Sequence, residues 1–311
     1  MQYSTFAAID IGSYDVILEI FEISKKQGIR SVDKICHRME LGKDTYTLGK
    51  IRPEMEEELC RVLADFVRIM EGYRVDDYRA TASSAISEAS NSLYVLGKIH
   101  QLTGLSVTVL SNSEQRFLSY KALAAMEDNF NKIIEKGTAI LDLDGGSFQI
   151  SLFDKDALVT TQNIRMGSLR IRERLAGIQS ETEHYEEMVE ELIWNEVSSF
   201  KKMYLKDRKI ENIMLIGDVF TDSVYQNIEE KTTKIISREN FNTWYEKIIR
   251  QSPMELAVKL GIPLENASLM YPSAVIYKCL IDMMGAEHIW IPGVHMTRGI
   301  AYEYAEQMKL L

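Results

Sequence analysis

The sequence predicts an α/β protein built from two similar domains, and three observations lead to that prediction. Its 311 residues exceed the usual size of one domain. Segments typical of strands alternate with segments typical of amphipathic helices along the chain. A strand, a glycine-containing turn and a second strand occur at residues 5–23 and again at residues 138–154. This repetition at about half the chain length indicates a duplicated unit.

The first half is predicted to begin with antiparallel strands and to continue with alternating helices and strands. The turn Gly12-Ser13-Tyr14 joins the first two strands into a hairpin. A helix begins at Pro53, because proline is favoured in a first helical turn and acidic residues follow it. The predicted strands cover residues 5–11, 15–23, 30–37, 76–83 and 105–110. The predicted helices cover residues 53–73, 84–101 and 113–126, the last of them capped by Ser111 or Ser113.

The second half repeats this opening and is richer in helices. Its first strand ends at a turn that contains Gly145-Gly146-Ser147, and a second strand follows immediately. The predicted strands cover residues 138–144, 148–154, 157–165, 212–216 and 288–292. The predicted helices cover residues 168–176, 181–204, 238–261, 271–285 and 296–309.

Charge and hydropathy narrow the classes of partner and compartment. The net charge is −10, which argues against non-specific binding of nucleic acid because that binding needs a basic surface. No apolar run of about 18 residues occurs, so we expect no membrane span. The opening residues lack the pattern of a signal peptide, so we expect a cytoplasmic protein.

The two glycine turns are the candidate functional elements. Glycine lets the backbone approach a ligand closely, and successive N–H groups in such a turn form a concavity that binds phosphate. Asp10 and Asp142 lie at the ends of the preceding strands, where they could hold Mg²⁺ directly or through water. The alternative is a pair of plain hairpins with aspartate as a local acceptor, but two matched turns favour the phosphate interpretation. The candidate phosphate-binding residues are Gly12, Ser13, Gly145, Gly146 and Ser147.

Six segments of the chain, in order from residue 7 to about residue 305, carry a resemblance to a known family. They are AAIDIGSYD, LGKDTYTLGKIRPE, SSAISEASN, LSNSEQRFLSY, LDLDGGSFQIS and MGSLRIRERL. In these segments the chain resembles the Ppx/GppA family of exopolyphosphatases and guanosine pentaphosphate phosphatases: AAIDIGSYD is similar to the family's first phosphate loop, and LDLDGGSFQIS is similar to its IDIGGGSTELV motif. The resemblance implies a duplicated actin-like (ribonuclease H-like) fold with an interdomain cleft, Mg²⁺, and removal of terminal phosphate.

The resemblance also implies domain boundaries and partners. We expect a first domain over residues 1–126, a second over residues 127–295, and a terminal helix over residues 296–311 that packs back on the first domain. We expect polyphosphate or a phosphorylated small molecule as the ligand in the cleft, no nucleic acid or membrane partner, and a homodimer.

The chain departs from the family at positions expected to carry the chemistry. The family's SGxEEA segment supplies a glutamate as the base, and Gln115 stands at that position with Glu114 beside it. An amide cannot accept a proton from water at neutral pH. Gln149 replaces a second expected glutamate, Asp144 replaces a loop glycine, and Ser87 replaces an arginine that would bind phosphate.

Three functions follow, and the sequence leaves open whether the chain is an enzyme. The first is a family member that binds polyphosphate or a phosphorylated nucleotide with weak or lost hydrolysis, a possible pseudoenzyme. The second is an active exopolyphosphatase or guanosine pentaphosphate phosphohydrolase that uses Glu114 as its base and Mg²⁺ at Asp10 and Asp142. The third is a non-catalytic, actin-like interaction protein.

Overall fold

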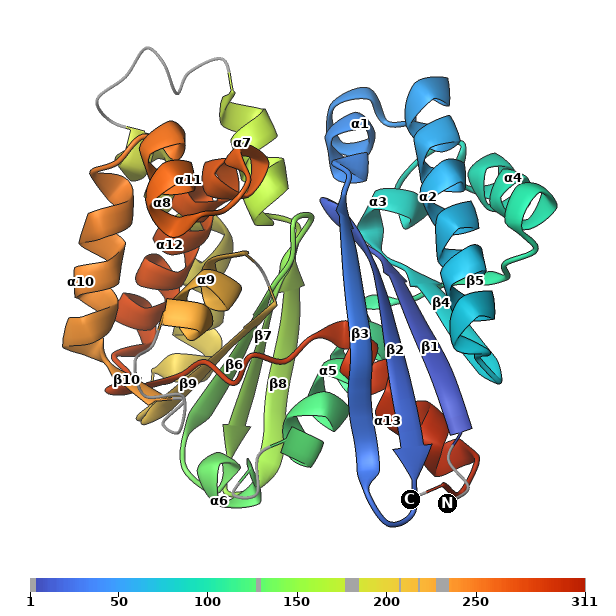
Figure 1. Cartoon of the computed structure of the whole chain (residues 1–311). Coiled ribbons are helices and arrows are strands. Elements are labelled where there is room, and N and C mark those ends of the chain that lie inside the picture. Colours follow the sequence, from blue (N-terminus) through green and yellow to red (C-terminus); the bar gives the residue numbers. More distant parts are fainter. Residues whose placement is uncertain are drawn as a thin grey trace. The chain divides into compact units, whose positions relative to one another are not determined.

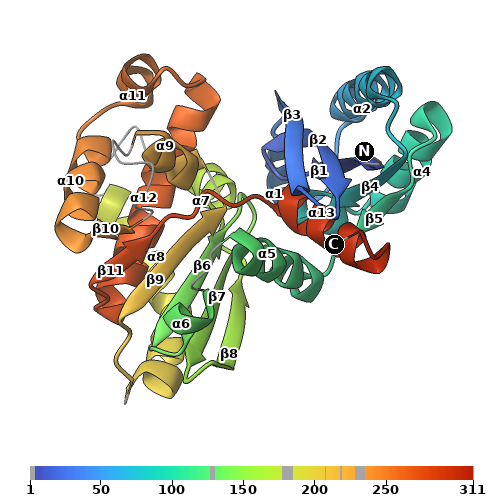
Figure 2. The same ribbon diagram turned by 60° about the horizontal axis from the view of Figure 1, so that its bottom comes forward.

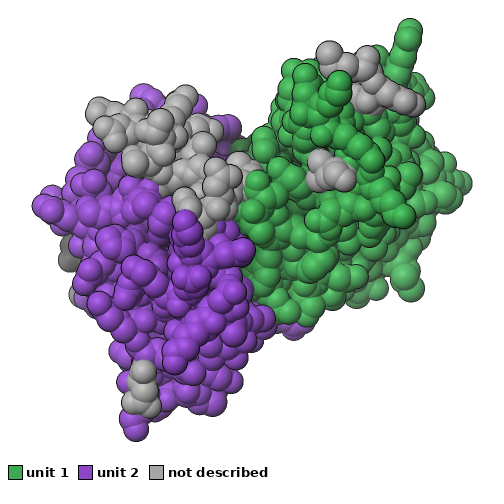
Figure 3. Space-filling view, turned by 90° about the horizontal axis from the view of Figure 1, so that it is seen from below, with its two compact units in different colours: residues 1–125, 294–311 green, residues 126–293 purple. Residues whose placement is uncertain are grey.

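A computed structural model describes residues 4–126, 130–176, 185–206, 208–217, 219–227 and 235–310. The chain divides into two compact units. Unit 1 comprises residues 1–125 and 294–311, and unit 2 comprises residues 126–293; Figure 3 colours them separately. In the part of the chain that the structure describes, no helix is both long and apolar enough to cross a membrane.

Unit 1 contains a five-stranded mixed sheet in the order β3-β2-β1-β4-β5 (Figure 1). β1, β2 and β3 pair antiparallel, whereas β1, β4 and β5 pair parallel. The strands are β1 (Ser4–Ile11), β2 (Asp15–Ser24), β3 (Gly28–Arg38), β4 (Asp77–Ala82) and β5 (Val107–Val109). The helices are α1 (Leu41–Leu48), α2 (Pro53–Tyr73), α3 (Ser84–Ser87), α4 (Ser92–Thr103), α5 (Asn112–Met126) and α13 (Met296–Gln307).

Helices cover both faces of this sheet, so β1 is apolar on both sides. Ala7, Ile9 and Ile11 point into a core shared with α2 and α4. Phe6 and Ala8 alternate with them and pack on the opposite face against α13; Figure 2 shows α13 beside the sheet of unit 1. A strand buried on both faces loses the alternation of apolar and polar residues, which explains the continuous apolar run TFAAIDI.

α13 is fixed to unit 1 by close packing and by a buried carboxylate. The rings of Phe6 and Tyr304 stack with centroids 4.0 Å apart. Glu19 on β2 is 3% exposed and accepts hydrogen bonds from the hydroxyls of Thr297 (2.5 Å) and Ser31 (2.6 Å). Two short charge-assisted bonds compensate part of the desolvation of this carboxylate. The last helix of the chain therefore belongs to the first unit.

Unit 2 repeats the strand pattern of unit 1. Its six-stranded sheet has the order β10-β11-β9-β6-β7-β8; β6, β7 and β8 are antiparallel, and β6, β9 and β11 are parallel. The strands are β6 (Thr138–Leu143), β7 (Phe148–Asp154), β8 (Ala157–Ile164), β9 (Asn212–Gly217), β10 (Ile235–Ser237) and β11 (His288–Trp290). The strands β8-β7-β6-β9-β11 repeat the order and directions of β3-β2-β1-β4-β5, which confirms the duplication that the sequence predicted.

The helices of unit 2 gather around one central helix. α12 (Leu264–Met284) packs against α7, α8, α9, α10 and α11 and is buried over most of its length. Its Tyr277 hydroxyl donates to the carbonyl of Ile216 at the end of β9 (3.1 Å). The other helical elements are α6 (Phe130–Ile134), α7 (Ser168–Leu175), α8 (Tyr185–Phe200), a π-helical turn (Lys201–Leu205), α9 (Val219–Asn227), α10 (Arg238–Ile249) and α11 (Pro253–Leu260).

Two helices predicted as continuous are each broken in two. The helix predicted over residues 84–101 splits into α3 and α4, because the Asn91 side chain bonds both the N–H and the carbonyl of Ile51 and the carboxylate of Glu56. The helix predicted over residues 238–261 splits into α10 and α11. Ser252 and Glu255 form a capping box, and Pro253 follows the cap, so a new helix begins there.

The boundaries of further elements also differ from the predictions. The strand predicted over residues 105–110 shortens to the three residues of β5. α12 begins at Leu264, before the predicted residue 271, and continues through Pro272. The start of the helix predicted over residues 181–204 lies outside the described residues. The sequence analysis missed four short elements, namely α1, α6, α9 and β10.

Candidate functional site

The first glycine turn connects β1 to β2 in unit 1. Asp10, the penultimate residue of β1, is half-buried and lies beside Thr81 on β4. The Thr81 hydroxyl donates to the Ile9 carbonyl (3.2 Å) and weakly to Asp10 Oδ1 (3.4 Å). The Gly12 N–H donates to the Asp15 carbonyl (2.9 Å), and a Cβ at Gly12 would lie 2.9 Å from Asp15 Oδ1. A larger residue at this position would therefore require the Asp15 side chain to shift.

Ser13 is part of this turn, and it is fully buried. Its hydroxyl lies 2.7 Å from the hydroxyl of Tyr46 on α1 and 3.4 Å from that of Ser84 on α3. The Tyr46 and Ser84 hydroxyls are themselves 2.9 Å apart. The three hydroxyls tie the first turn to two helices, and a contact between Ser13 and phosphate would require this cluster to open.

The negative charge of Asp15, the residue that follows the first turn, is neutralised by a neighbouring arginine. Asp15 is buried and accepts a hydrogen bond from Arg38 (2.7 Å), the last residue of β3. The Cys36 thiol donates to the same carboxylate (3.6 Å). Cys36 is exposed as a residue, but desolvation of its sulfur, together with Asp15, raises the pKa of the thiol to about 12, so it is protonated at neutral pH.

The second glycine turn connects β6 to β7 in unit 2. Asp142 is again the penultimate residue of its strand and lies opposite Gln149 on β7. The Asp144 N–H donates to the Ser147 carbonyl (2.9 Å), which closes the turn. The Asp144 carboxylate accepts the N–H of Gly145 (2.5 Å). The Asp144 carboxylate thus occupies the Gly145 N–H, a group that we expected to bind phosphate.

The N-terminus of α7 packs directly on this second turn. A Cβ at Gly167 would lie 2.3 Å from the Asp144 carbonyl oxygen, so only glycine fits there. The Arg170 N–H donates to the Gly145 carbonyl (2.9 Å), and Arg170 Nε donates to the Gly146 carbonyl (2.8 Å). Carbonyls of the second turn thus accept N–H groups from the first turn of α7, while the dipole of this helix still favours an anion near its N-terminus.

Two polar atoms near this turn have no partner among the described residues. The Ser168 hydroxyl, on the first residue of α7, is fully buried and unpaired. The buried Oδ1 of Asn163 on β8, whose partner in register on β7 is Gln149, is also unpaired. Buried polar atoms normally have a partner, so these atoms mark where a ligand or water would bind. The sequence analysis missed Ser168 and Arg170, although it had identified the segment MGSLRIRERL that contains them.

Glu114, the candidate base, is used as a helix cap. Its carboxylate accepts hydrogen bonds from the Ser111 N–H (2.8 Å) and the Ser111 hydroxyl (2.7 Å), and its own N–H donates to that hydroxyl (3.3 Å). This capping box begins α5 and identifies Ser111, not Ser113, as the cap. The Ser111 hydroxyl and N–H lower the pKa of Glu114, which makes its carboxylate a weaker base.

The two glutamines at expected glutamate positions are both buried. Gln115 is 8% exposed, and its Nε2 donates to the Leu110 carbonyl (3.1 Å). An ionised glutamate could not make this bond because it has no donor. Gln149 is 6% exposed within β7. Ser87, where the family pattern has arginine, is exposed at the end of α3.

The structure therefore groups the candidate residues into three local sets. Asp10, Gly12 and Ser13 meet at the first turn. Asp142, Gly145, Gly146 and Ser147 meet at the second turn, together with Ser168 and Arg170. Glu114 forms the capping box of α5 with Ser111 and belongs to neither turn. Among the described residues, no group of three or more His, Cys, Asp or Glu side chains is placed to hold a metal ion.

A family model and several known proteins match the sequence of this chain. The model described as "Ppx/GppA phosphatase family" matches residues 19–308. The bifunctional 3-dehydroquinate synthase/phosphatase of Fusobacterium nucleatum is 21% identical over 310 residues, which cover 91% of this chain and 44% of that protein. Exopolyphosphatase 1 of Mycobacterium leprae is 25% identical over 144 residues, which cover 46% of this chain and 41% of that protein. The matched region spans less than half the length of these curated relatives.

Solved structures confirm the predicted actin-like fold. An exopolyphosphatase from Cytophaga hutchinsonii superposes with a TM-score of 0.86 at 18% identity and covers 98% of both chains. The Ppx/GppA family member of Aquifex aeolicus superposes with a TM-score of 0.78 at 18% identity and covers 99% of both chains.

Proposed function

The chain belongs to the Ppx/GppA phosphatase family, and we propose that it binds polyphosphate or a phosphorylated nucleotide with weak or absent hydrolysis. The ligand contacts are assigned to the two glycine turns. The reduced hydrolysis is assigned to the missing general base.

One observation carries the second half of this proposal. The buried Gln115 amide donates to the Leu110 carbonyl, while Glu114 is held in the capping box of α5. A general base contributes about 10²–10⁴-fold to a reaction that needs one. Gln115 cannot accept a proton, and the pKa of Glu114 is lowered by its cap. Neither residue is suited to activate a water molecule.

The binding half of the proposal rests on the second turn. The buried glycines Gly145 and Gly146, the N-terminus of α7 and the unpaired hydroxyl of Ser168 form a local environment that suits phosphate oxygens. Asp142 and Asp144 oppose this by adding negative charge. A divalent cation would offset that charge, because metal ions bridge phosphate oxygens and neutralise them.

Mg²⁺ is the cation that this donor set fits. Asp10 and Asp142 each present one half-buried carboxylate at the end of a strand. Mg²⁺ is usually bound through one or two carboxylates, with water and substrate phosphates completing an octahedron. We propose that water and the phosphates of the ligand supply the remaining ligands of the metal. Bound there, Mg²⁺ would neutralise charge on the phosphates.

The test measures binding and hydrolysis separately. A ligand that binds only the folded state raises the melting temperature, so polyphosphate, guanosine pentaphosphate and nucleoside triphosphates are compared with Mg²⁺ present. We expect a shift with at least one of them and no phosphate release above the protein-free rate. Phosphate release that Glu114→Gln abolishes would instead favour the active phosphohydrolase. No shift with any of these ligands would favour an actin-like interaction protein.

The proposal also includes a cytoplasmic homodimer. Light scattering coupled to size-exclusion chromatography tests the assembly, and a mass equal to one chain at all concentrations would exclude it. Fractionation of the source cells tests the compartment.

A further inference from the structure

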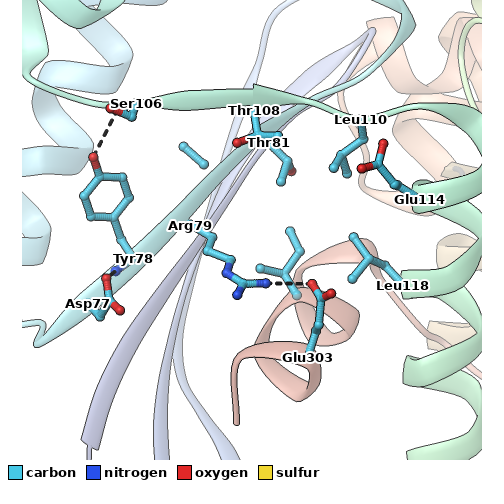
Figure 4. A pocket seen from close by; sticks show the side chains of 12 residues that line it. Asp77, Tyr78, Arg79, Thr81, Ser106, Thr108, Leu110, Glu114, Leu118 and Glu303 are labelled. Atoms are coloured by element: carbon cyan, nitrogen blue, oxygen red, sulfur yellow. Dashed lines mark hydrogen bonds and ion pairs between the residues drawn. The ribbon is translucent and has the colours of Figure 1, made fainter. Parts of the chain in front are cut away.

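A cavity of about 450 Å³ lies within unit 1, apart from both glycine turns. Its floor is formed by β4 and β5, and its walls are formed by α5 and α13 (Figure 4). The cavity is open to solvent on one side, and its volume is typical of small-molecule sites. Asp10, Gly12 and Ser13 do not line it. The cavity therefore needs an explanation separate from the phosphate proposal.

The charged residues of the cavity are mostly acidic. Asp77, Glu114 and Glu303 line it, with Arg79 as the only basic residue in the lining. Arg79 donates to Glu303 (2.6 Å) and to the side chain of Gln307, so the charges of Arg79 and Glu303 compensate each other, and Asp77 and Glu114 leave the lining negative. The lowered pKa of Glu114 keeps that carboxylate ionised at neutral pH. The cavity is thus expected to repel phosphates and to attract cations.

The remaining lining is apolar, which distinguishes an organic cation from a metal ion. Leu110, Leu118 and Ile300 contribute aliphatic side chains. In Figure 4 the carboxylates of Glu114 and Glu303 both point toward the space beside Leu118. A metal ion would need several oxygen ligands at short range, and the described residues hold no such cluster. An aliphatic chain with a terminal ammonium group matches both the apolar and the acidic parts of this surface.

We infer that this cavity binds a small aliphatic amine, with Glu114 receiving an ammonium group and Leu118 and Ile300 contacting its carbon chain. The site goes beyond the phosphorylated-ligand proposal and does not depend on it. Thr81 lies on the cavity floor and donates weakly to Asp10, so the cavity adjoins the strand end that forms the first turn.

The experiment is calorimetric titration of the full chain with putrescine, and with butanediol as the uncharged analogue. Glu114→Gln removes a charge from the cavity, while glutamine can still complete a capping box. Glu255→Gln is the matched control, because Ser252 and Glu255 form the same capping box in unit 2, outside the cavity. Thr108→Lys places a positive charge at the exposed rim on β5.

We expect saturable binding of putrescine and none of butanediol. Glu114→Gln should weaken putrescine binding by about tenfold or more, the effect expected for one charge-assisted contact. Glu255→Gln should leave the affinity unchanged, and Thr108→Lys should abolish binding while the circular dichroism spectrum stays that of the native chain. Three results would each overturn the inference: no saturable heat with putrescine, equal binding of butanediol, or equal weakening by Glu114→Gln and Glu255→Gln. The last would show that putrescine responds only to the overall negative charge of the protein.

Discussion

Replacing Asp144 by asparagine should strengthen the binding of a phosphorylated ligand at the second turn. The Asp144 carboxylate accepts the Gly145 N–H (2.5 Å) and adds a negative charge beside Gly146 and the N-terminus of α7. Asparagine keeps a side-chain oxygen that can accept the same N–H, so the turn is retained. The charge, which competes with phosphate for these donors, is removed.

The size of this effect follows from the bond that the ligand must displace. A hydrogen bond to a charged group contributes about 1.5–3 kcal/mol. Asparagine can still accept the Gly145 N–H, but this neutral bond contributes only about 0.5–1.5 kcal/mol, so the affinity for phosphate should increase by about tenfold. Added salt should reduce the difference between variant and wild type, because part of it is long-range repulsion.

The assay is calorimetric titration with short-chain polyphosphate in the presence of Mg²⁺. Asp156→Asn is the matched control, because Asp156 lies exposed in the turn between β7 and β8, where its φ of 61° suits asparagine equally well. We expect tighter binding for Asp144→Asn and no change for Asp156→Asn. Equal affinities for wild type and Asp144→Asn would refute the assignment of phosphate to the second turn.

Three further predictions concern stability. Thr297→Val removes a donor from the buried Glu19 carboxylate and should lower the free energy of unfolding, measured in urea titrations, by about 2 kcal/mol. Thr297→Ser keeps a hydroxyl and should lower this free energy less. Equal losses for the two variants would contradict the anchoring role of the bond. Gly217→Ala should lower the free energy of unfolding by about 2–4 kcal/mol in the same titration. The reason is that Gly217 has a φ of +93° and that a Cβ there would lie 2.3 Å from a β6 carbonyl oxygen. An unchanged urea midpoint would contradict this prediction. The Ser252 N–H and hydroxyl lower the pKa of Glu255, so their stabilisation is present at neutral pH and is lost as the pH falls through that lowered pKa. The difference between the urea midpoints of Ser252→Ala and wild type should therefore be larger at neutral pH than in acid, where only the bond from the Glu255 N–H to the Ser252 hydroxyl remains to be lost. A difference independent of pH would contradict the mechanism.

The duplicated strands were predictable because their pattern depends on neighbouring residues. The buried runs that end at Gly12 and at Gly145 define the two hairpins directly, and Pro53 marks the start of α2 where the structure has it. The broken helices were not predictable in the same way. Asn91 ends one helical segment through bonds to Ile51 and Glu56, which lie far away in the sequence. Local periodicity carries no information about such contacts.

The candidate site was predictable in its frame and less so in its details. Asp10 and Asp142 occupy equivalent strand ends, as the repeated pattern indicated. The burial of Ser13 depends on Tyr46 and Ser84, which reach it from two separate helices. The contact of Arg170 with the second turn likewise depends on how α7 packs. Short sequence motifs cannot supply these tertiary contacts.

The central claim is that this family member lacks the base needed for hydrolysis. Release of inorganic phosphate from polyphosphate with Mg²⁺, measured for wild type and for the double variant Gln115→Glu/Gln149→Glu, tests it most directly. We predict no release above the protein-free rate for wild type and measurable release for the double variant, because glutamate at both positions restores the family pattern. Wild-type turnover that Glu114→Gln abolishes would contradict the claim and assign Glu114 as the base.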